Sequence, residues 1–327
     1  MKRLGGRFQS IVMAALSVTV FLVAFPGDAV WSQPRRQIKM IVPFPPGGGV
    51  DVLARIVGEE ISRVHGQTIV IDNRPGAGTV IGTEAAARSM PDGNTLLMTA
   101  PAFLVNPHLR KLNYDPVTGF EPVCRLVTLP MVLVVNGSSS YRTLSDFVDA
   151  ARKKPGALTL ATLPGSLFHI AFEMLKRATH ADIALVPYTG AAPAVTALLG
   201  GHVTSAFVNY LEIAEQLKTH KLRALATTSP SRIELLPEVP TVAESGYGDI
   251  EAEGWTGVFA PAKTPKDIIA QLSSWFDASL RTPEIRQRLV DQGEFPAGIC
   301  GVDFAAFLRK QYDDYGQVIR NANIKAE

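Results

Sequence analysis

A turn rich in proline and glycine, at residues 43–51, joins a strand pattern to a helix pattern near the beginning of the chain. The apolar residues at 38–42 indicate a strand, and those from Val52 to Val64 recur at helical spacing. The three glycines at 47–49 let backbone N–H groups converge at the start of that helix, where the helix dipole favours an anion. The turn therefore predicts a small-anion site on a strand–turn–helix unit.

Strand and helix patterns continue to alternate after this turn. Strands are expected over residues 38–42, 68–72 and 95–99, and helices over 50–64 and about 82–89. Because such alternation requires right-handed crossovers, this block predicts a parallel sheet with helices packed on it.

A second alternating block follows residues 123–136, a long β-rich stretch that can cross from one domain to another. Its first helix is expected at 143–154, capped by Thr143 or Ser145. The later strands and helices are expected, in alternating order, at 158–162, 166–178, 183–188, 192–199, 203–209, about 213–219 and 222–228. The block predicts a second compact α/β unit.

A return crossing is expected at residues 253–261, around Trp255. Helices are then expected at 266–280, 284–292 and 304–321. If both crossings hold, the first lobe is discontinuous, with residues 34–130 and 253–327, and the second lobe is 131–252. Two α/β lobes joined by two strands form a hinge with a cleft, and ligands of open α/β sheets bind beyond the carboxyl ends of the strands.

The beginning of the chain has the layout of a secretory signal peptide. Lys2 and Arg3 precede an apolar run at residues 11–25, and small residues follow it. We expect residues 1–29 to be the signal peptide, with cleavage near Ala29. A permanent membrane anchor is the weaker alternative, because about 15 apolar residues fall short of the roughly 20 needed to span a bilayer.

Loss of that segment would remove three basic residues and one acidic residue, changing the net charge from +2 to zero. A neutral chain with no basic run argues against nucleic acid or an anionic membrane surface as the partner. The remaining chain, of close to 300 residues, is too long for one typical core and favours two domains. We expect a soluble exported product.

The chain has two cysteines, Cys124 and Cys300. In an oxidising compartment they could pair; the alternative is two buried thiols, since the sequence does not set their distance. No Cys/His spacing resembles a zinc site, so no metal is expected.

The glycine turn does not have the G-x-G-x-x-G spacing of a dinucleotide site, so no cofactor is expected. Asp51, in the first turn of the following helix, is a candidate to orient the loop by accepting backbone N–H bonds. An ordinary first-turn acid is the alternative for this residue.

A second strand-to-helix turn, containing Gly165, Ser166 and His169, lies in the other predicted lobe. Ser166 fits an N-cap, and His169 lies one turn later, so this helix start is a second site that favours an anion. A hydrolase pair of Ser166 and His169 is the alternative, but a nucleophile elbow needs G-x-S-x-G, which is absent, and no acid is evident to orient the histidine.

Neutral hydrogen-bonding residues follow the next strands of the second lobe, at Tyr188, Thr189, Gly190 and Asn209. Ala100, after the third strand of the first lobe, could line the opposite wall. With few basic residues nearby, a carboxylate in this cleft would be held mainly by backbone N–H groups, hydroxyls and water.

The sequence resembles a known family, the Bug-type extracytoplasmic solute receptors of tripartite tricarboxylate transporters. The order and spacing of many short segments carry the resemblance over almost the full mature length. They include Val42-Pro43-Phe44 with Gly47-Gly48 and Asp51, Asn73-Arg74-Pro75-Gly76-Ala77, Pro91-Asp92-Gly93, Val186-Pro187-Tyr188 with Gly190 and Pro193, Pro240-Thr241 with Glu244-Ser245-Gly246, Trp255, and Thr264-Pro265.

The resemblance implies a periplasmic-binding-protein fold of type II, with two α/β lobes closing on a small solute that is often a carboxylate. The residue pattern and the resemblance together give the candidate ligand contacts. These are Phe44, Pro46, Gly47, Gly48, Gly49, Val50, Asp51 and Ala100 in the first lobe, and Gly165, Ser166, His169, Tyr188, Thr189, Gly190 and Asn209 in the second. The chain departs from the family pattern at Thr79, at residues 162–164 and at Asn209, which leaves the identity of the ligand open.

The expected function is therefore that of a non-enzymatic periplasmic receptor. It would capture a small organic acid and deliver it to the membrane subunits of a tripartite tricarboxylate-type transporter, acting as a monomer without cofactor or metal. The alternatives are a serine-type hydrolase on the same fold and an orphan solute sensor in signalling.

Overall fold

The computed structural model describes residues 37–248 and 250–325. The predicted signal peptide and its cleavage near Ala29 lie outside the described residues. Within these ranges no helix is both long enough and apolar enough to pass through a membrane.

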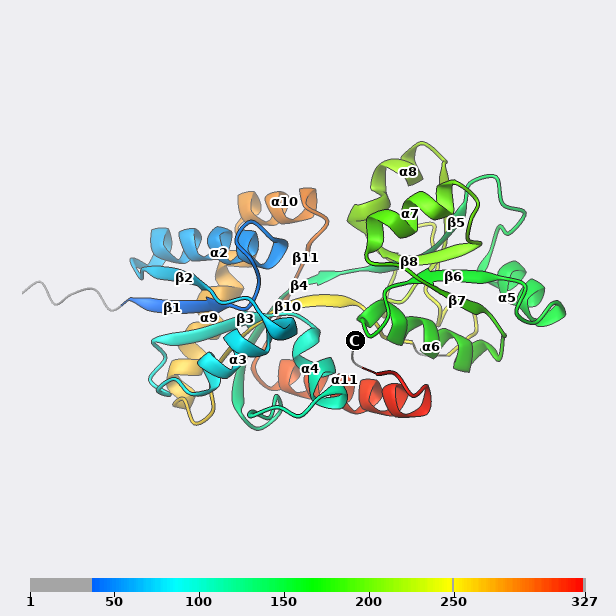
Figure 1. Ribbon diagram of the computed structural model, residues 1–327. Coiled ribbons are helices and arrows are strands. Elements are labelled where there is room, and N and C mark those ends of the chain that lie inside the picture. Colours follow the sequence, from blue (N-terminus) through cyan, green and yellow to red (C-terminus); the bar gives the residue numbers. More distant parts are fainter. Residues whose placement is uncertain (1–36, 249, 326–327) are drawn as a thin grey trace, which may run out of the picture. The chain divides into compact units, whose positions relative to one another are not determined.

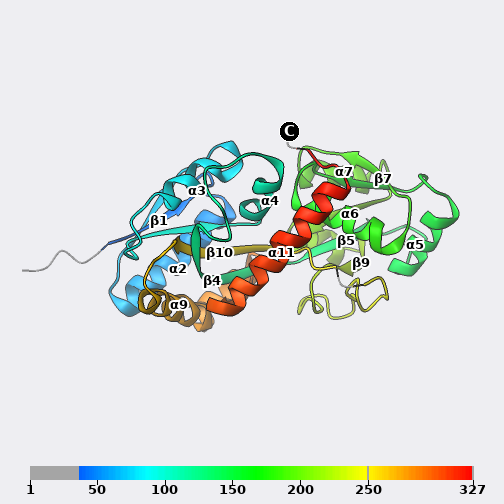
Figure 2. The same ribbon diagram turned by 90° about the horizontal axis from the view of Figure 1, so that it is seen from below.

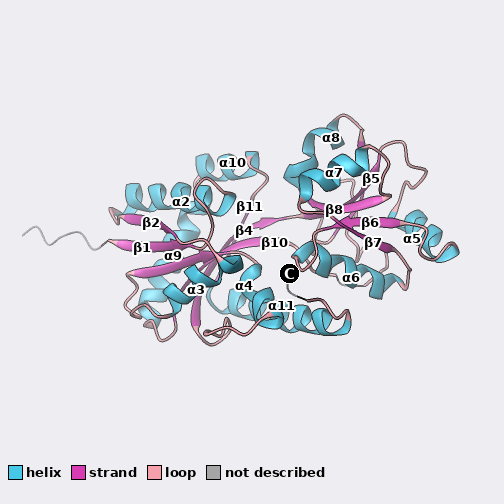
Figure 3. Cartoon of the chain, viewed as in Figure 1, coloured by secondary structure: helices cyan, strands magenta, loops and turns pink. Residues whose placement is uncertain are grey.

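The first sheet is built from β1 (Ile38–Val42), β2 (Ile69–Asn73), β3 (Thr95–Thr99), β4 (Phe120–Leu129), β10 (Gly254–Pro261) and β11 (Phe295–Cys300). Their order across the sheet is β11-β4-β10-β3-β1-β2 (Figures 1 and 3). β1 runs parallel to β2 and β3, which confirms the parallel pairing predicted for the first block. β10 and β11 run antiparallel to β4, so the complete sheet is mixed.

Helices cover both faces of this sheet. They are α2 (Gly49–His65), α3 (Val80–Ala87), α4 (Ala102–Leu109), α9 (Lys266–Arg281), α10 (Pro283–Asp291) and α11 (Gly301–Asn321), with the short 3₁₀ turn η1 (Ala77–Thr79). α2 packs against α9, and α4 packs against α3 and α11. Successive β1 residues face two different cores, because Met40 belongs to the same buried cluster as Phe276 of α9, whereas Ile41 belongs to the same cluster as Phe103 of α4.

The second sheet is built from β5 (Met131–Asn136), β6 (Thr159–Thr162), β7 (Ala184–Pro187), β8 (Ser205–Asn209) and β9 (Leu222–Thr227). Their order is β7-β6-β8-β5-β9 (Figure 1). β6 is parallel to β7 and β8. β9 does not extend that parallel run as its alternation with helices predicted, because β5 occupies the place beside β8 and pairs antiparallel with both β8 and β9.

The helices of the second sheet lie where the sequence predicted them. They are α5 (Leu144–Lys153), α6 (Leu167–Thr179), α7 (Ala191–Leu199) and α8 (Ala214–Lys218); the short 3₁₀ helix η2 (Tyr210–Ile213) was not predicted. At the start of α5, Thr143 accepts from the Asp146 N–H and the Asp146 carboxylate accepts from the Thr143 N–H, which confirms the expected cap.

The chain passes from the first sheet to the second between β4 and β5, and returns in the segment that leads from β9 to β10. A buried ion pair joins the two crossings, with Arg125 of β4 at 3.2 Å from Glu253. α11 packs against α6, as Figure 2 also shows, so this last helix of the first sheet contacts a helix of the second.

The helix α4 and the strand β11 were not predicted from the sequence, nor was the short helix η1. α4 contains Pro107, and β11 contains Pro296 and Gly298, residues that ordinarily interrupt a helix or strand. β11 tolerates them because its pairing with β4 is irregular between Pro296 and Ile299.

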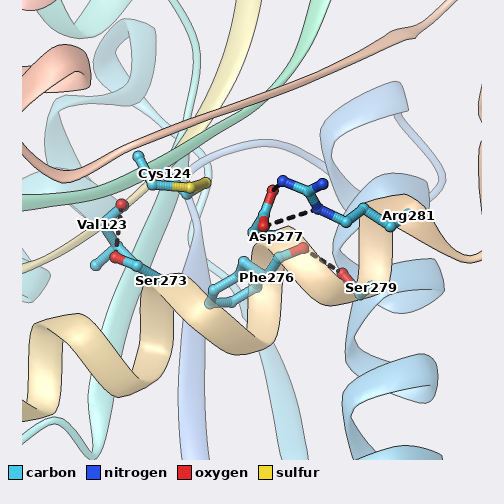
Figure 4. Close-up of a disulfide and its surroundings, with 8 residues drawn as sticks. Val123, Cys124, Ser273, Phe276, Asp277, Ser279 and Arg281 are labelled. Atoms are coloured by element: carbon cyan, nitrogen blue, oxygen red, sulfur yellow. Dashed lines mark hydrogen bonds and ion pairs between the residues drawn. A yellow bond between two sulfur atoms is a disulfide. The ribbon is translucent and has the colours of Figure 1, made fainter.

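The two cysteines, whose pairing the sequence left open, form a disulfide between β4 and β11. Cys124 and Cys300 lie directly opposite each other in this strand pair. Figure 4 shows Cys124 close to α9, where the Ser273 hydroxyl donates to the carbonyl of Val123 at 2.9 Å. The disulfide therefore joins the strand that leads to the second sheet with the strand that follows α10.

Candidate functional site

The predicted anion-binding turn leads from β1 into α2. Gly48 is the N-cap of this 17-residue helix, and no side chain caps its first-turn N–H groups. Gly47 has a φ of +80°, which a residue with a Cβ rarely adopts. The turn from Pro45 to Gly49 is largely exposed. The first helix start is therefore open to a ligand oxygen.

Asp51 is buried behind this turn and accepts hydrogen bonds that fix its shape. Its Oδ2 accepts from the Gly47 N–H at 2.9 Å and from Arg55 Nε at 3.0 Å. Its Oδ1 accepts from Asn73 Nδ2 at 3.0 Å, and the same amide donates to the Phe44 carbonyl at 3.2 Å. With an exposed fraction of 2%, Asp51 has the loop-orienting hydrogen bond expected of it and faces the turn, not the solvent.

The electrostatics of Asp51 follow from these contacts. Burial acts to raise the pKa of its carboxyl, but the hydrogen bonds from Arg55, Gly47 and Asn73 outweigh burial and hold the pKa below its ordinary value. Asp51 is thus ionised at neutral pH, and its charge is matched by Arg55 in an i,i+4 pair. Arg55 and Asn73 belong to this network, although neither was predicted from the sequence to be a site residue.

The second predicted turn leads from β6 into α6. Ser166 is the N-cap of α6, as predicted, but its hydroxyl donates to the Leu163 carbonyl at 2.6 Å and no side chain caps the helix. The Gly165 N–H donates to His169 Nδ1 at 3.2 Å. The N–H groups of the first turn of α6 are therefore open, as they are in α2.

The same contacts bear on the hydrolase alternative. Because Nδ1 of His169 accepts a hydrogen bond, the imidazole is neutral with its proton on Nε2, which lies 3.9 Å from Glu173. Burial, followed by the charge of Lys176, lowers the pKa of His169. Ser166 and His169 thus bond to backbone groups, and the proton relay of a serine nucleophile is not arranged here.

The remaining predicted residues lie at the ends of other strands. Tyr188 follows β7 and its N–H donates to the Thr162 carbonyl at 2.9 Å, while Gly190 is the N-cap of α7, again with no side-chain cap. Thr189 lies exposed between them. The Asn209 N–H, at the end of β8, donates to Glu212 at 3.1 Å. Ala100 lies beside Pro101, the N-cap of α4.

A third segment, the turn that links α10 to β11, also reaches this region. An ideal Cβ on Gly49 would lie 3.4 Å from Glu294 Oε1, and one on Gly293 would lie 2.7 Å from the Cβ of Leu211 in η2. The ring of Phe295 lies 6.3 Å from that of Tyr210. Residues 293–295 therefore contact both the start of α2 and the helix that follows Asn209.

Glu294 is the acid that sequence reasoning missed. It is 5% exposed, and its Oε2 has no hydrogen-bond partner among the described residues. Burial raises the pKa of its carboxyl to about 7. The sequence signal is weak: a single acid follows a glycine at the end of a helix, and nothing local connects it to a turn far earlier in the chain.

A cavity of about 690 Å³ is lined by α8, β9 and residues 235–240. None of the predicted ligand contacts lines it. Among residues 37–248 and 250–325, no group of three or more His, Cys, Asp or Glu is placed to hold a metal ion.

Comparison with known proteins supplies the context for this geometry. A family model described as "Tripartite tricarboxylate transporter family receptor" matches residues 53–324. Protein BugT of Bordetella pertussis is 34% identical over 296 residues, covering 89% of this chain and 91% of BugT.

Solved structures agree with the sequence match. A TctC solute binding protein from Polaromonas, solved with no ligand, superposes with a TM-score of 0.82 at 28% identity, covering 89% of this chain and 100% of that one. Rpa4515 of R. palustris, solved with adipate, gives a TM-score of 0.71 at 31% identity, covering 90% and 99%.

These similarities confirm the periplasmic-binding-protein fold class predicted from the sequence. They also confirm the resemblance, which now rests on a match along most of the chain. The chain belongs to the receptor family of the tripartite tricarboxylate transporters, among its Bug-type members.

Proposed function

We propose that this chain is a periplasmic receptor that captures a small carboxylate between the start of α2 and the start of α6 and presents it to the membrane subunits of a tripartite tricarboxylate-type transporter. The two lobes, residues 34–130 with 253–327 and residues 131–252, would close on the acid by a hinge motion, in a protein that acts as a monomer. No reaction is part of this function.

The observation that carries the proposal is a pair of uncapped helix starts, one on each sheet. α2 follows β1 and α6 follows β6, both at the carboxyl ends of parallel strands, where ligands of open α/β sheets bind. Each start offers backbone N–H groups and the positive end of a helix dipole to an anion. Two such sites can hold an acid without an arginine side chain.

The chemistry of the site supports a carboxylate over other anions. The proposed contacts include no lysine or arginine, so a multiply charged phosphate would have no cation to meet it. A singly charged carboxylate is matched by N–H groups, hydroxyls and water. The adipate bound to Rpa4515 is a dicarboxylate, which makes linear dicarboxylates the first ligands to test.

A thermal-shift screen tests the function. At 100 times its dissociation constant a ligand adds about 2.7 kcal/mol of stability, which raises the Tm by roughly 5 °C for a chain of this size. We expect at least one acid from a panel of adipate, malate, succinate, aromatic acids and amino acids to produce this shift. The corresponding amides should produce none.

The matched variants are Asp51→Asn and Asp72→Asn. Asp51 anchors the turn at α2, whereas Asp72 pairs with Arg74 near the end of β2 and is no part of the proposed site. We expect Asp51→Asn to weaken the shift and Asp72→Asn to leave it unchanged. If no acid shifts the Tm while an ester is hydrolysed and Ser166→Ala abolishes that hydrolysis, the receptor function is wrong and the hydrolase alternative holds.

A further inference from the structure

Glu294 is a buried acid that has no role in the function proposed above. Its carboxyl is 5% exposed, and Oε2 has no hydrogen-bond partner among residues 37–248 and 250–325. A buried polar atom without a partner costs free energy, and native proteins keep few of them. A ligand that binds reversibly would supply the missing hydrogen-bond partner.

The carboxyl is aimed at the start of α2. Its Oε1 would lie 3.4 Å from a Cβ placed on Gly49, the first residue of that helix. α10, which precedes Glu294, packs against α2 (Figure 1). Glu294 therefore lies beside the N–H groups that the proposed ligand carboxylate would use.

The same turn also touches the second lobe. Gly293 approaches Leu211 of η2 so closely that a Cβ on residue 293 would lie 2.7 Å from the Leu211 Cβ, and Phe295 contacts Tyr210. Both partners follow Asn209, a proposed contact of the second lobe. Glu294 thus lies between the start of α2 and residues that follow β8, which belong to different lobes in the function proposed above.

The charge state of Glu294 decides which ligand group it can accept. An ionised carboxylate at this place would repel a ligand carboxylate at the same helix start, whereas a protonated carboxyl could donate a hydrogen bond to it. Burial alone raises the pKa of Glu294, to about 7, so the protonated form is available near neutral pH.

We propose that Glu294 is a ligand-binding residue that, in its protonated form, donates a hydrogen bond from Oε2 to the carboxylate held at the start of α2. This inference rests on the carboxylate-binding function proposed above. When Glu294 is ionised in the free protein, capture takes up one proton from the solvent, which stays on Oε2 until the ligand leaves. The ligand itself remains a carboxylate throughout.

Other ionisable groups lie on the elements packed around Glu294. They are Asp51, Arg55, Glu59, Glu60, Arg63 and His65 on α2, Glu212 on η2, Glu284, Arg286, Arg288 and Asp291 on α10, and Arg125 and Glu253 beside β11. None of them contributes to the raised pKa of Glu294, which has burial as its cause. Glu212 also has a pKa raised by burial, so its contribution to any pH dependence has to be measured separately.

The experiment is isothermal titration calorimetry with the acid from the panel above that gives the largest thermal shift. It is run between pH 6 and pH 8.5 in two buffers of different ionisation enthalpy. For a group with a pKa of about 7, the dissociation constant should rise about 30-fold across this range. Proton uptake should rise from near zero to near one per ligand bound.

Three variants identify the group responsible. Glu294→Gln keeps a donor without a titrating proton, and should bind with a nearly constant dissociation constant and no proton uptake. Glu59→Gln, an exposed acid on α2, and Glu212→Gln should both keep the wild-type pH dependence. If Glu294→Gln does not fold, Glu294→Leu replaces it and should bind weakly at every pH.

Each of the other possible outcomes contradicts the proposal, and each gives a different result in the titration. Binding of an acid with a dissociation constant that does not change between pH 6 and pH 8.5 leaves the receptor function in place and rejects the role of Glu294. Tighter binding at high pH, together with a preference for ligands that carry an ammonium group, would show that Glu294 acts as an anion. Absence of binding by every acid at pH 6 rejects the proposed function, and this inference with it.

Discussion

The two helix starts that make up the proposed site are held in different ways. The turn before α2 is anchored by an ionised, buried aspartate that bonds to Gly47, Arg55 and Asn73. The turn before α6 is anchored by neutral groups, with His169 accepting from Gly165 and Ser166 donating to Leu163. Charged hydrogen bonds are roughly twice as strong as neutral ones, so the first turn is the more firmly built of the two.

The sheet behind the first turn carries a further constraint. The disulfide between Cys124 and Cys300 ties β4 to β11, and β11 follows directly after Glu294. No disulfide joins the described strands of the second sheet, since both cysteines lie in the first. The difference favours a preformed first half of the proposed site and a second half that can adjust when a ligand binds.

The largest expected effect comes from removing the disulfide. The double variant Cys124→Ser with Cys300→Ser opens a loop of 176 residues in sequence separation, which should lower the free energy of unfolding by about 5 kcal/mol in the chain-entropy model. Urea unfolding measures this loss, with the oxidised wild type as the reference. A loss below about 1 kcal/mol would show that the first sheet does not depend on this link.

The second effect is a pH dependence of stability that comes from Glu294. Its folded pKa of about 7 exceeds the ordinary 4.5, so the folded state binds the proton more tightly than the unfolded state. The stabilisation is complete below pH 4.5 and is lost as the pH rises through 7, amounting to about 3 kcal/mol. Denaturant unfolding at pH 5 and pH 8.5 should show this loss in the wild type but not in Glu294→Gln.

Asp51→Ala tests the charged anchor of the first turn. It leaves Asn73 and the Gly47 N–H without their partner, which should cost about 2 kcal/mol of stability and weaken ligand binding at least about tenfold. In the wild type the Asp51 contribution is present above the ordinary pKa of 3.8 and is lost as the pH falls further. Calorimetry at pH 6, with Asp72→Asn as control, measures the change in affinity, and an unchanged affinity would contradict the anchoring role.

His169→Ala tests the neutral anchor of the second turn and should have the smallest effect. It removes one neutral hydrogen bond to Gly165, which is worth about 1 kcal/mol. The hydrogen bond from the Ser166 hydroxyl to the Leu163 carbonyl remains in this variant, so ligand affinity should fall by less than for Asp51→Ala. A larger loss at His169 than at Asp51 would reverse the comparison between the two turns.

Local patterns predicted most of the elements because their apolar residues repeat with the period of the element they form. β1, β3 and α2 begin and end within a residue of their predicted bounds. The sequence failed where pairing decides the structure. β9 pairs antiparallel with β5, and β11 forms despite Pro296 and Gly298 because it pairs with β4.

For the proposed site, the sequence predicted the local turns but not the contacts between distant residues. Gly47, Asp51 and Ser166 could be singled out from the sequence because they lie between a strand and a helix, and helix capping depends on local sequence. Glu294 could not be found in this way, since its meaning depends on a contact with Gly49 made only in the folded chain. The sequence placed Asn73 in a turn, but it did not predict the hydrogen bond from Asn73 to Asp51.

The central claim is that two helix starts, one on each sheet, hold the carboxylate. A crystal structure of the protein purified with its retained acid, or soaked with the tightest binder of the panel, tests this claim most directly. We expect carboxylate oxygens at about 2.8–3.1 Å from backbone nitrogens in the first turn of α2, with the first turn of α6 contacting the same ligand. An acid bound through lysine or arginine side chains, or in the cavity beside α8 and β9, would contradict the account.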